Sequence, residues 1–379
     1  MSASARVSAI LFLCLFAGQA GLIALSPVLV EVASNLGVST AAAGQLRTIS
    51  GLAAGLTALS LAAVSRRLQL RQLLVGGSTL LAVGSLASAA APNFAVLALL
   101  QLVIGVAVAV LVTAGTAAVA EWTPPEQRAR VLSWALVGNP AAWIIGMPVA
   151  GLVGGASWRY AWLGLPLVGA VVAACAAATA PRSAPSGAAR GGLLAALSDR
   201  DVNRWALGEL LANSAWIGLL VYSGALFTES YGTSTVRTGV VLAIAAVAFA
   251  AGNLTSRRHA DGDLRQRLVA LALAMAVIVP LFGIVRPSSG VSAGLFAVAA
   301  FLGGARTLLG NAFGLQAAPE RRVAVMAARA AANQFGYFVG SAVGGIALAA
   351  AGYPGLAVVL GLLFVAAAAA LSTRPSYQT

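Results

Sequence analysis

FAVLALLQLVIGVAVAVLVTAGTAAVA, residues 94–120, contains no charged side chain. An α-helix needs about 20 apolar residues to cross the hydrocarbon core of a bilayer, so this stretch is long enough to span a membrane. Similar runs recur along the chain, and the short polar gaps between them hold nearly every charged residue. These runs predict twelve spans, near residues 7–30, 41–64, 72–91, 94–120, 130–155, 159–180, 204–228, 236–255, 266–285, 291–316, 323–350 and 354–372.

The composition agrees with a protein whose solvent is lipid. Hydrophobic residues make up 60% of the chain and charged residues 9%, with a mean hydropathy of +0.92. A water-soluble domain of 379 residues with this composition is excluded. Backbone amides in the hydrocarbon region must be satisfied within the protein, and such continuous apolar runs do not fit alternating barrel strands. We therefore predict an all-α polytopic membrane protein.

The formal charge of +13 is explained by membrane topology rather than by nucleic-acid binding. With the amino terminus inside, the external segments hold only Arg159, Arg237 and Arg286, and the cytoplasmic segments hold most other arginines. The sequence therefore predicts a multi-pass protein of the cytoplasmic membrane, with both termini in the cytoplasm and no nucleic-acid partner.

The sequence divides into two halves. The stretch PRSAPSGAARGGLLAALSDRD at Pro181–Asp201 is rich in Pro, Gly, Ser and charge. It predicts an amino-terminal six-helix bundle at 1–180, a cytoplasmic linker at 181–203 and a carboxyl-terminal six-helix bundle at 204–379.

Short motifs repeat between these halves. VSRR at Val64–Arg67 recurs as TSRR at Thr255–Arg258, and PPEQR at Pro124–Arg128 recurs as APERR at Ala318–Arg322. Repeated six-helix units that rock about a shared substrate site are a known transporter architecture. The repeat therefore predicts two pseudo-symmetric six-helix bundles and a transport function.

Four stretches carry a family resemblance: SPVLVEVASNLGVS at Ser26–Ser39, EWTPPEQRARVLS at Glu121–Ser133, GMPVAGLVGG at Gly146–Gly155 and WRYAW at Trp158–Trp162. With them the chain resembles the major facilitator superfamily, and within it the twelve-span drug and metabolite efflux antiporters. The third stretch is similar to the antiporter motif of that family, with Gly146, Pro148 and Gly151. The resemblance implies a small-molecule substrate, exchange for protons and alternating access.

The chain departs from the family pattern at two places. The cytoplasmic gate loop of the family has an aspartate before its arginine, whereas this chain has Ser65 and Arg66, and Ser256 and Arg257 in the second half. Gln101 stands where the family often has a helix-4 arginine linked to proton transfer. The family's aspartate is thought to hold the two halves together by its charge, which serine lacks. Proton coupling cannot be inferred from the family's helix-4 motif, because Gln101 replaces its arginine.

Small residues at four-residue spacing predict close helix packing. In the fifth span, Gly146 and Pro148 are expected to interrupt the regular backbone hydrogen bonds of the helix. Two interpretations of these residues are open: a sealed contact between the two halves, or ordinary helix packing around a kink. In the eleventh span, Gly336, Gly340 and Gly344 predict a packing seam.

Charged residues inside predicted spans are costly and therefore candidates for function. Glu209 is the one carboxylate well inside a predicted span, so we assign it a role in proton coupling or substrate binding. The alternative is that Glu209 lies near the membrane interface and its side chain extends to the headgroups. Arg306 is predicted to be its neighbour, as a counter-ion, as a partner of an anionic substrate group or in a structural ion pair. Arg329 is expected to reach the cytoplasmic headgroups. Glu31 and Arg47 are external-gate candidates.

Polar and aromatic side chains complete the candidate set. Asn213 and Trp216 follow Glu209 along one face of the predicted helix. Gln19 and Gln101 are candidate cavity contacts or interhelical glue.

No phosphate-binding glycine loop, cluster of metal ligands or nucleophile elbow occurs in the sequence. We therefore expect no enzyme activity, no cofactor and no metal. The leading hypothesis is a monomeric exporter of a small amphipathic drug or metabolite, in exchange for protons. A sugar or nucleoside exporter, an importer or facilitator, and a non-transporting membrane sensor or scaffold are the alternatives.

Overall fold

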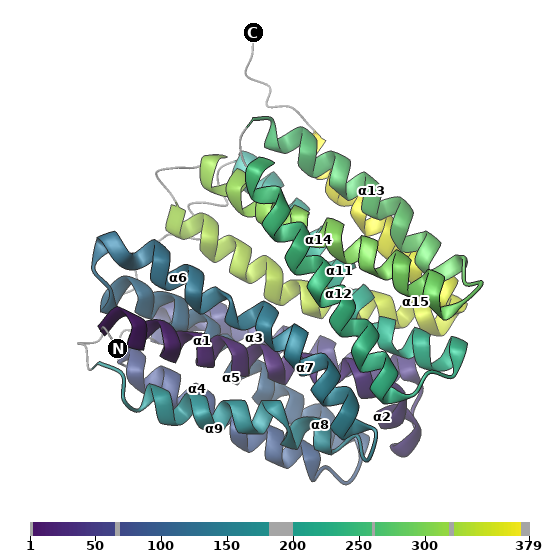
Figure 1. The fold of residues 1–379 in the computed structure, drawn as a ribbon, viewed down its shortest axis with the longest axis horizontal. Coiled ribbons are helices and arrows are strands. Elements are labelled where there is room, and N and C mark those ends of the chain that lie inside the picture. The colour runs from purple at the N-terminus through teal and green to yellow at the C-terminus, as the bar shows by residue number, and fades with distance from the viewer. Residues whose placement is uncertain (1–2, 65–68, 182–199, 260–261, 318–321, 373–379) are drawn as a thin grey trace. The chain divides into compact units, whose positions relative to one another are not determined.

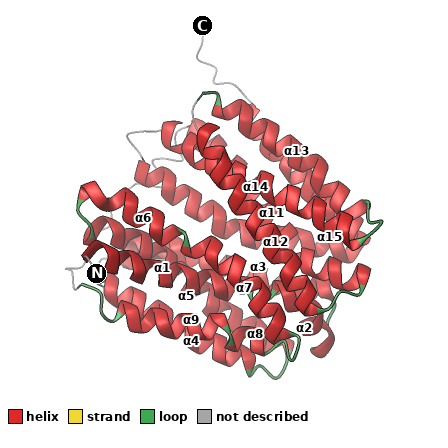
Figure 2. Cartoon of the chain, viewed as in Figure 1, coloured by secondary structure: helices red, strands yellow, loops and turns green. Residues whose placement is uncertain are grey.

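The computed structural model describes residues 3–64, 69–181, 200–259, 262–317 and 322–372 (Figure 1). Within these ranges every regular element is a helix, as Figure 2 shows. Ser65 and Arg66 of the predicted gate loop, and residues 182–199 of the predicted linker, lie outside the described residues. So does most of the repeated motif at Ala318–Arg322.

The first half of the chain forms nine α-helices among the described residues, with two short 3-10 helices, η1 and η3. In chain order they are α1 (Ala3–Ile23), η1 (Ser26–Val28), α2 (Leu29–Asn35), α3 (Thr40–Val64), α4 (Leu70–Ala89), α5 (Phe94–Trp122), η3 (Pro125–Gln127), α6 (Arg128–Leu136), α7 (Gly138–Gly154), α8 (Tyr160–Leu163) and α9 (Leu165–Ala177).

The second half has fewer and longer helices. They are α11 (Arg200–Tyr231), α12 (Thr235–Thr255), η4 (Ser256–His259), α13 (Leu264–Ile284), α14 (Ser289–Ala317) and α15 (Arg322–Ser372).

Three predicted spans are interrupted among the described residues. In the span predicted at 130–155, α6 ends at Leu136 and α7 begins at Gly138. In the other two, a proline lies in the interruption or just after it. The span predicted at 7–30 is split by η1, which contains Pro27. Proline has no amide donor and its ring collides with the preceding turn, so the α-helical ladder cannot continue through it. The span predicted at 159–180 is split at Gly164, whose ψ of −127° is outside the helical region, and α9 then starts with Pro166 in its first turn.

The last two predicted spans are joined into α15 across a kink. Ala351 and Gly352 leave the helical conformation there, and Gly352 has a φ of +62°. That left-handed conformation is open to glycine at little cost because glycine lacks a Cβ. The kink therefore marks the boundary between the spans predicted at 323–350 and 354–372.

The described residues contain ten helical segments that are long and apolar enough to cross a membrane, and three of these segments each combine two of the α-helices named above: α1 with α2, α6 with α7, and α8 with α9. One of the ten covers both spans of α15, and α3 occupies the span predicted at 41–64. The prediction of an all-α polytopic membrane protein is confirmed.

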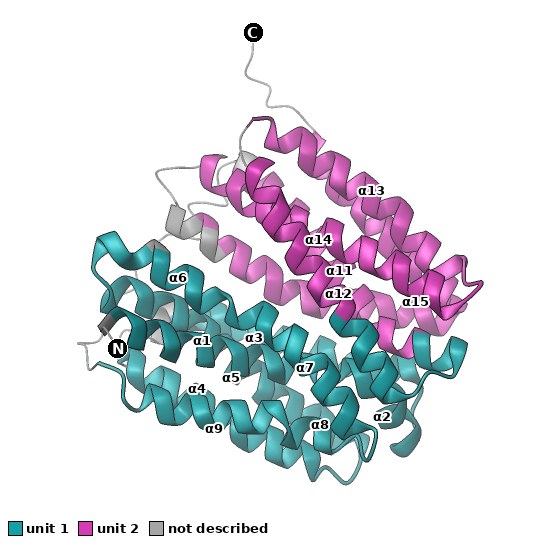
Figure 3. Cartoon of the chain, in the orientation of Figure 1, with its two compact units in different colours: residues 1–188, 227–243 teal, residues 189–226, 244–379 magenta. Residues whose placement is uncertain are grey.

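The chain forms two compact units, which Figure 3 colours separately. Unit 1 contains residues 1–188 and 227–243, and unit 2 contains residues 189–226 and 244–379. In unit 1, α1 packs against α5, α7 and α9, while α5 also packs against α3 and α4. The end of α11 and the start of α12 belong by their contacts to unit 1.

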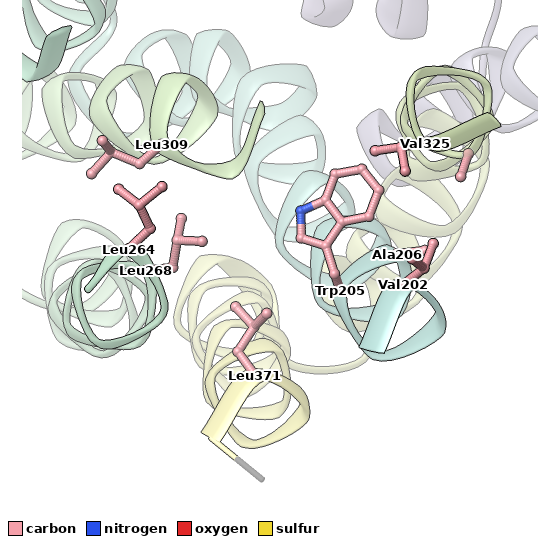
Figure 4. Close-up of a cluster of buried hydrophobic side chains, with 9 residues drawn as sticks. Val202, Trp205, Ala206, Leu264, Leu268, Leu309, Val325 and Leu371 are labelled. Atoms are coloured by element: carbon pink, nitrogen blue, oxygen red, sulfur yellow. The ribbon is translucent and has the colours of Figure 1, made fainter. Parts of the chain in front are cut away.

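Unit 2 is built around contacts of α13 with α14 and α15. Figure 4 shows one of its apolar clusters, in which the indole ring of Trp205 on α11 lies among aliphatic side chains from α13, α14 and α15. Leu264, Leu309, Val325 and Leu371 are members of this cluster, and each is at least 97% buried. The cluster fixes the position of α11 at Trp205, one turn before Glu209.

Candidate functional site

Glu209 lies on α11, nine residues after the helix begins at Arg200 (209 − 200 = 9). At about 1.5 Å per residue, it stands roughly 14 Å from that end of the helix. Its side chain is fully buried. A buried carboxylate requires charged or hydrogen-bonding partners, because its transfer out of water is costly.

Two arginines from two other helices supply those partners. Nη2 of Arg306, on α14, lies 2.7 Å from Oε1 of Glu209 and also donates to the carbonyl oxygen of Gly208 at 3.2 Å. Nη1 of Arg329, on α15, forms an ion pair with the second carboxylate oxygen, Oε2. One carboxylate therefore bridges two guanidinium groups, and we call Glu209, Arg306 and Arg329 the ion cluster.

The expected neighbourhood of Glu209 and Arg306 is present in the structure, whereas the interpretation of Arg329 is wrong. We expected Arg329 to reach the lipid headgroups, but its side chain is only 11% exposed and turns to Glu209. A sequence signal existed: Glu209 and Arg329 lie at similar depths in spans that run in the same direction. Five residues separate Arg204 from Glu209, and seven separate Arg322 from Arg329.

Glycine on α14 makes room for the carboxylate. A Cβ atom at Gly310 would lie 2.6 Å from Oε1 of Glu209, closer than any ordinary contact. The carbonyl oxygen of Gly310 also accepts a hydrogen bond of 3.0 Å from Nε1 of Trp205. Gly310 therefore positions Glu209 by leaving space for its carboxylate, while its backbone anchors the preceding turn of α11. Sequence reasoning missed this residue, because only the facing helix gives it meaning.

Amides near the ion cluster carry unsatisfied polar atoms. Among the described residues, no hydrogen-bond partner is present for Nδ2 of Asn213, Oε1 of Gln334 or Oδ1 of Asn311, and all three atoms are buried. Asn213 is one turn from Glu209 on α11, and Gly336 of α15 packs against it. Buried amides usually have partners, so these atoms are available to a ligand or water. Asn213 was predicted as a candidate, whereas Gln334 and Asn311 were missed.

An aromatic cluster lies two turns further along α11. The Trp216 ring stacks on Phe249 of α12, with centroids 5.5 Å apart, and on Phe296 of α14, at 6.4 Å. Phe296 in turn stacks on Phe282 of α13 at 5.4 Å. The helix face predicted to carry Glu209, Asn213 and Trp216 therefore extends from the charged ion cluster to an apolar aromatic cluster.

The antiporter-like motif on α7 packs backbone to backbone against α12, within unit 1. A Cβ at Gly151 would lie 2.7 Å from the carbonyl oxygen of Thr235, and a Cβ at Gly239 would lie 2.6 Å from that of Met147. Gly146 instead faces Ile23 of α1. Pro148 lies within the continuous helix α7. Glycines on both helices therefore make this contact possible, and any larger residue would force them apart.

The eleventh-span glycines form the predicted packing seam. Gly336, Gly340 and Gly344 face Asn213, Ser214 and Tyr222 of α11, respectively. The seam holds α15 against α11 and thereby sets the distance between Arg329 and Glu209.

The two external-gate candidates have partners on different elements. Oε1 of Glu31 accepts a hydrogen bond from the Thr235 hydroxyl, whereas Arg47 donates to the carbonyl oxygen of Gly21 at 3.5 Å. Arg47 is nevertheless 99% buried.

The remaining candidates lie apart from the ion cluster along the chain. Gln101 on α5 is fully buried, and neither of its side-chain polar atoms has a hydrogen-bond partner in the described part of the chain. Gln19 on α1 is half-buried. Ser256 is buried at the start of η4, while Arg257 beside it is exposed.

Chemically, the ion cluster can exchange partners. Its arginines can bind an anion, and its carboxylate can bind a cation or a proton once the arginines withdraw. Intramembrane ionisable residues of this kind mark substrate or ion pathways. The geometry therefore allows an exchange of charged partners at the ion cluster.

Comparison with known proteins agrees with a membrane transporter. The family model described as Major Facilitator Superfamily matches residues 11–314. A protein of Pseudomonas aeruginosa named transcription regulatory protein OpdE is 26% identical over 257 residues, which are 66% of this chain and 64% of that protein. The chain thus matches somewhat less than two thirds of the length of that relative.

Solved structures share the fold over nearly the whole chain. A bacterial homologue of the human lysosomal transporter Spinster, inward-facing and occupied, aligns with a TM-score of 0.81 at 14% identity, covering 97% of this chain and 96% of that one. The nucleoside transporter NupG aligns at 0.77, with 13% identity and coverage of 98% and 99%. The human organic anion transporter MFSD10 aligns at 0.72, with 16% identity and coverage of 98% and 100%.

Proposed function

Because the chain belongs to the Major Facilitator Superfamily, and so is a transporter rather than an enzyme, we propose that it exports a small amphipathic compound across the cytoplasmic membrane by alternating access. The observation that carries the proposal is the ion cluster of Glu209, Arg306 and Arg329. Three charges buried on three different helices are costly, and a role in substrate handling accounts for that cost.

The outward direction of transport is supported by α7. Its GMPVAG stretch resembles the antiporter motif, and Gly151 brings α7 into backbone contact with Thr235 and Gly239 of α12. A tight contact of this kind can limit leak through the protein while substrate moves. An importer would not need this motif, although the fold alone is compatible with either direction.

We further propose that the compound is exported in exchange for protons, and that Glu209 is the residue that binds the proton. Arginines contact both carboxylate oxygens of Glu209, so neither oxygen is open to a proton in this arrangement. Glu209 would accept a proton in a state in which at least one arginine has moved away. The protein would act as a monomer, with the small molecule, protons and the bilayer as its partners.

Transport into inverted membrane vesicles tests this function. Solutes that raise the unfolding temperature of the purified protein are selected first, because a ligand that binds the native state stabilises it. Their uptake is then measured with and without an imposed pH gradient. We expect uptake by the wild type that depends on the gradient, and uptake by Glu209→Gln that does not.

The control is Glu126→Gln, which removes an exposed carboxylate within η3. Wild-type uptake that ignores the gradient would eliminate proton exchange, and full gradient-driven uptake by Glu209→Gln would eliminate Glu209 as the carrier. If no stabilising solute enters the vesicles at all, export itself is the wrong conclusion.

A second candidate function follows from the name of the Pseudomonas aeruginosa relative, which is a transcription regulatory protein. A membrane sensor would bind a solute without moving it. The vesicle experiment separates the two functions, because a sensor gives thermal protection without uptake.

A further inference from the structure

The ion cluster lacks one negative charge. Among the described residues, Arg306 and Arg329 contact one carboxylate, that of Glu209, so the cluster carries two positive charges and one negative charge. Asp263, another carboxylate of unit 2, instead caps α13 by accepting from the amide of Gln266. An unbalanced charge in a buried site is unfavourable, so the cluster as it stands favours the arrival of an anion.

Within the described part of the chain, two buried hydrogen-bond donors in or beside the cluster have no partner. Nη2 of Arg306 serves Glu209 and Gly208, but Nε of Arg306 is buried without a partner in the described ranges. Nδ2 of Asn213, one turn along α11, is a further buried donor without a partner there. A guanidinium offers five donors in a planar fork that suits carboxylates and phosphates. The unused groups are therefore the kind that an anion requires.

The three charged side chains differ in their exposure. Glu209 and Arg306 are 0% and 3% exposed and lie 2.7 Å apart, whereas Arg329 is 11% exposed. Arg329 is therefore the most accessible of the three charged side chains. If a ligand anion pairs with Arg329, Glu209 keeps Arg306, and two positive charges face two negative ones.

We propose that Arg329 binds the anionic group of the transported compound, while Glu209 occupies that position when no substrate is present and afterwards remains the counter-ion of Arg306. The inference rests on the proposed transport function and narrows its substrate to an organic anion. The aromatic cluster at Trp216 lies seven residues from Glu209 on the same helix face, roughly 10 Å away. A carboxylate or sulfonate attached to an apolar ring system fits that spacing.

The experiment measures binding to the purified full-length protein and needs no transport. The probes are benzoate, naphthoate and naphthalenesulfonate, each paired with the neutral amide of the same ring system at constant ionic strength. Thermal unfolding reports binding, because a ligand of the native state raises the unfolding temperature. We expect at least one anion of the series to protect the wild type, at about tenfold lower concentration than its amide.

Two variants move the affinity in opposite directions. Arg329→Gln leaves the neutral pair of Glu209 and Arg306, and we expect it to weaken anion binding about tenfold or more. Glu209→Gln removes the competing carboxylate, and we expect it to strengthen anion binding. Arg237→Gln is the matched control, since Arg237 is exposed on α12 and its loss gives the same change in net charge.

The outcomes are distinct. If no anion of the series protects better than its amide, or if Glu209→Gln weakens anion binding as Arg329→Gln does, the cluster is a structural ion pair and the inference is wrong. Should either variant fail to fold, Arg329→Lys retains the charge and is expected to keep the preference for anions over amides. If anions bind but are not taken up into vesicles, the transport function is refuted and the anion site stands. If only neutral compounds are taken up, the anion site is refuted and the transport function stands.

Discussion

Replacing Gly310 by alanine tests whether the position of the Glu209 carboxylate depends on a missing side chain. A Cβ at position 310 would lie 2.6 Å from Oε1 of Glu209, whereas ordinary contacts begin at 3.4 Å. The carboxylate must therefore retreat by about 0.8 Å (3.4 − 2.6), or the two helices must separate. Either movement lengthens the 2.7 Å contact with Arg306 toward roughly 3.5 Å (2.7 + 0.8).

The cost follows from Coulomb attraction. With an effective dielectric constant of about 20, opposite unit charges attract by roughly 6 kcal/mol at the shorter distance and roughly 5 kcal/mol at the longer one. The displacement thus loses about 1 kcal/mol from this ion pair, and overpacking adds about 1–3 kcal/mol. Alanine regains at most about 1 kcal/mol through its higher helix propensity. Gly310→Ala is therefore expected to be destabilising overall.

The assay is thermal unfolding in detergent, followed by tryptophan fluorescence. Gly294→Ala is the matched control, because it lies on the same helix and a Cβ there would meet nothing within 4 Å. We expect Gly310→Ala to unfold several degrees below Gly294→Ala, at roughly 2–4 °C per kcal/mol. Equal unfolding temperatures, together with unchanged anion binding, would show that Gly310 does not position Glu209.

Two further substitutions test other parts of the fold. Gly151→Ala places a Cβ 2.7 Å from the Thr235 carbonyl oxygen, so we expect it to reduce substrate uptake into vesicles. The control is Gly76→Ala, whose added Cβ meets nothing within 4 Å. Equal uptake rates for the two variants would show that the contact of α7 with α12 has no part in transport. Gly352→Ala places a Cβ at a φ of +62° and a ψ of −161°, a conformation adopted almost only by glycine. It should lower the free energy of unfolding by about 1–3 kcal/mol, measured by denaturant titration; an unchanged value would mean that the kink relaxes without strain.

Apolar runs predicted the helices well because bilayer thickness fixes their length. The span predicted at 94–120 is α5 at Phe94–Trp122, and the span predicted at 236–255 is α12 at Thr235–Thr255. The interruptions at Pro27 and Gly164 were not predicted, since hydropathy alone does not register backbone geometry. Both contain a proline or glycine signal that a stricter sequence analysis could use.

The candidate site was harder to predict because its residues come from three helices. Glu209 and Arg306 were selected by one rule, the high cost of charge within a span, and they do lie together. The same rule also selected Arg329. Its depth could be read from the sequence, but its partner could be identified only once the packing and rotation of α15 against α11 were known. Gly310 carries no chemical signal at all, since its importance is that it leaves space for a side chain of another helix.

The ion cluster has a consequence for biosynthesis. Glu209 leaves the ribosome 97 residues before Arg306 and 120 residues before Arg329 (329 − 209). At about 5–20 residues per second, the carboxylate waits roughly 6–24 s for its second partner. During that interval the nascent chain holds a charged side chain in or near lipid without its final counter-ions. Membrane insertion of α11 is therefore provisional until translation has passed Arg329, and a chain truncated before that point would be a natural target for quality-control proteases.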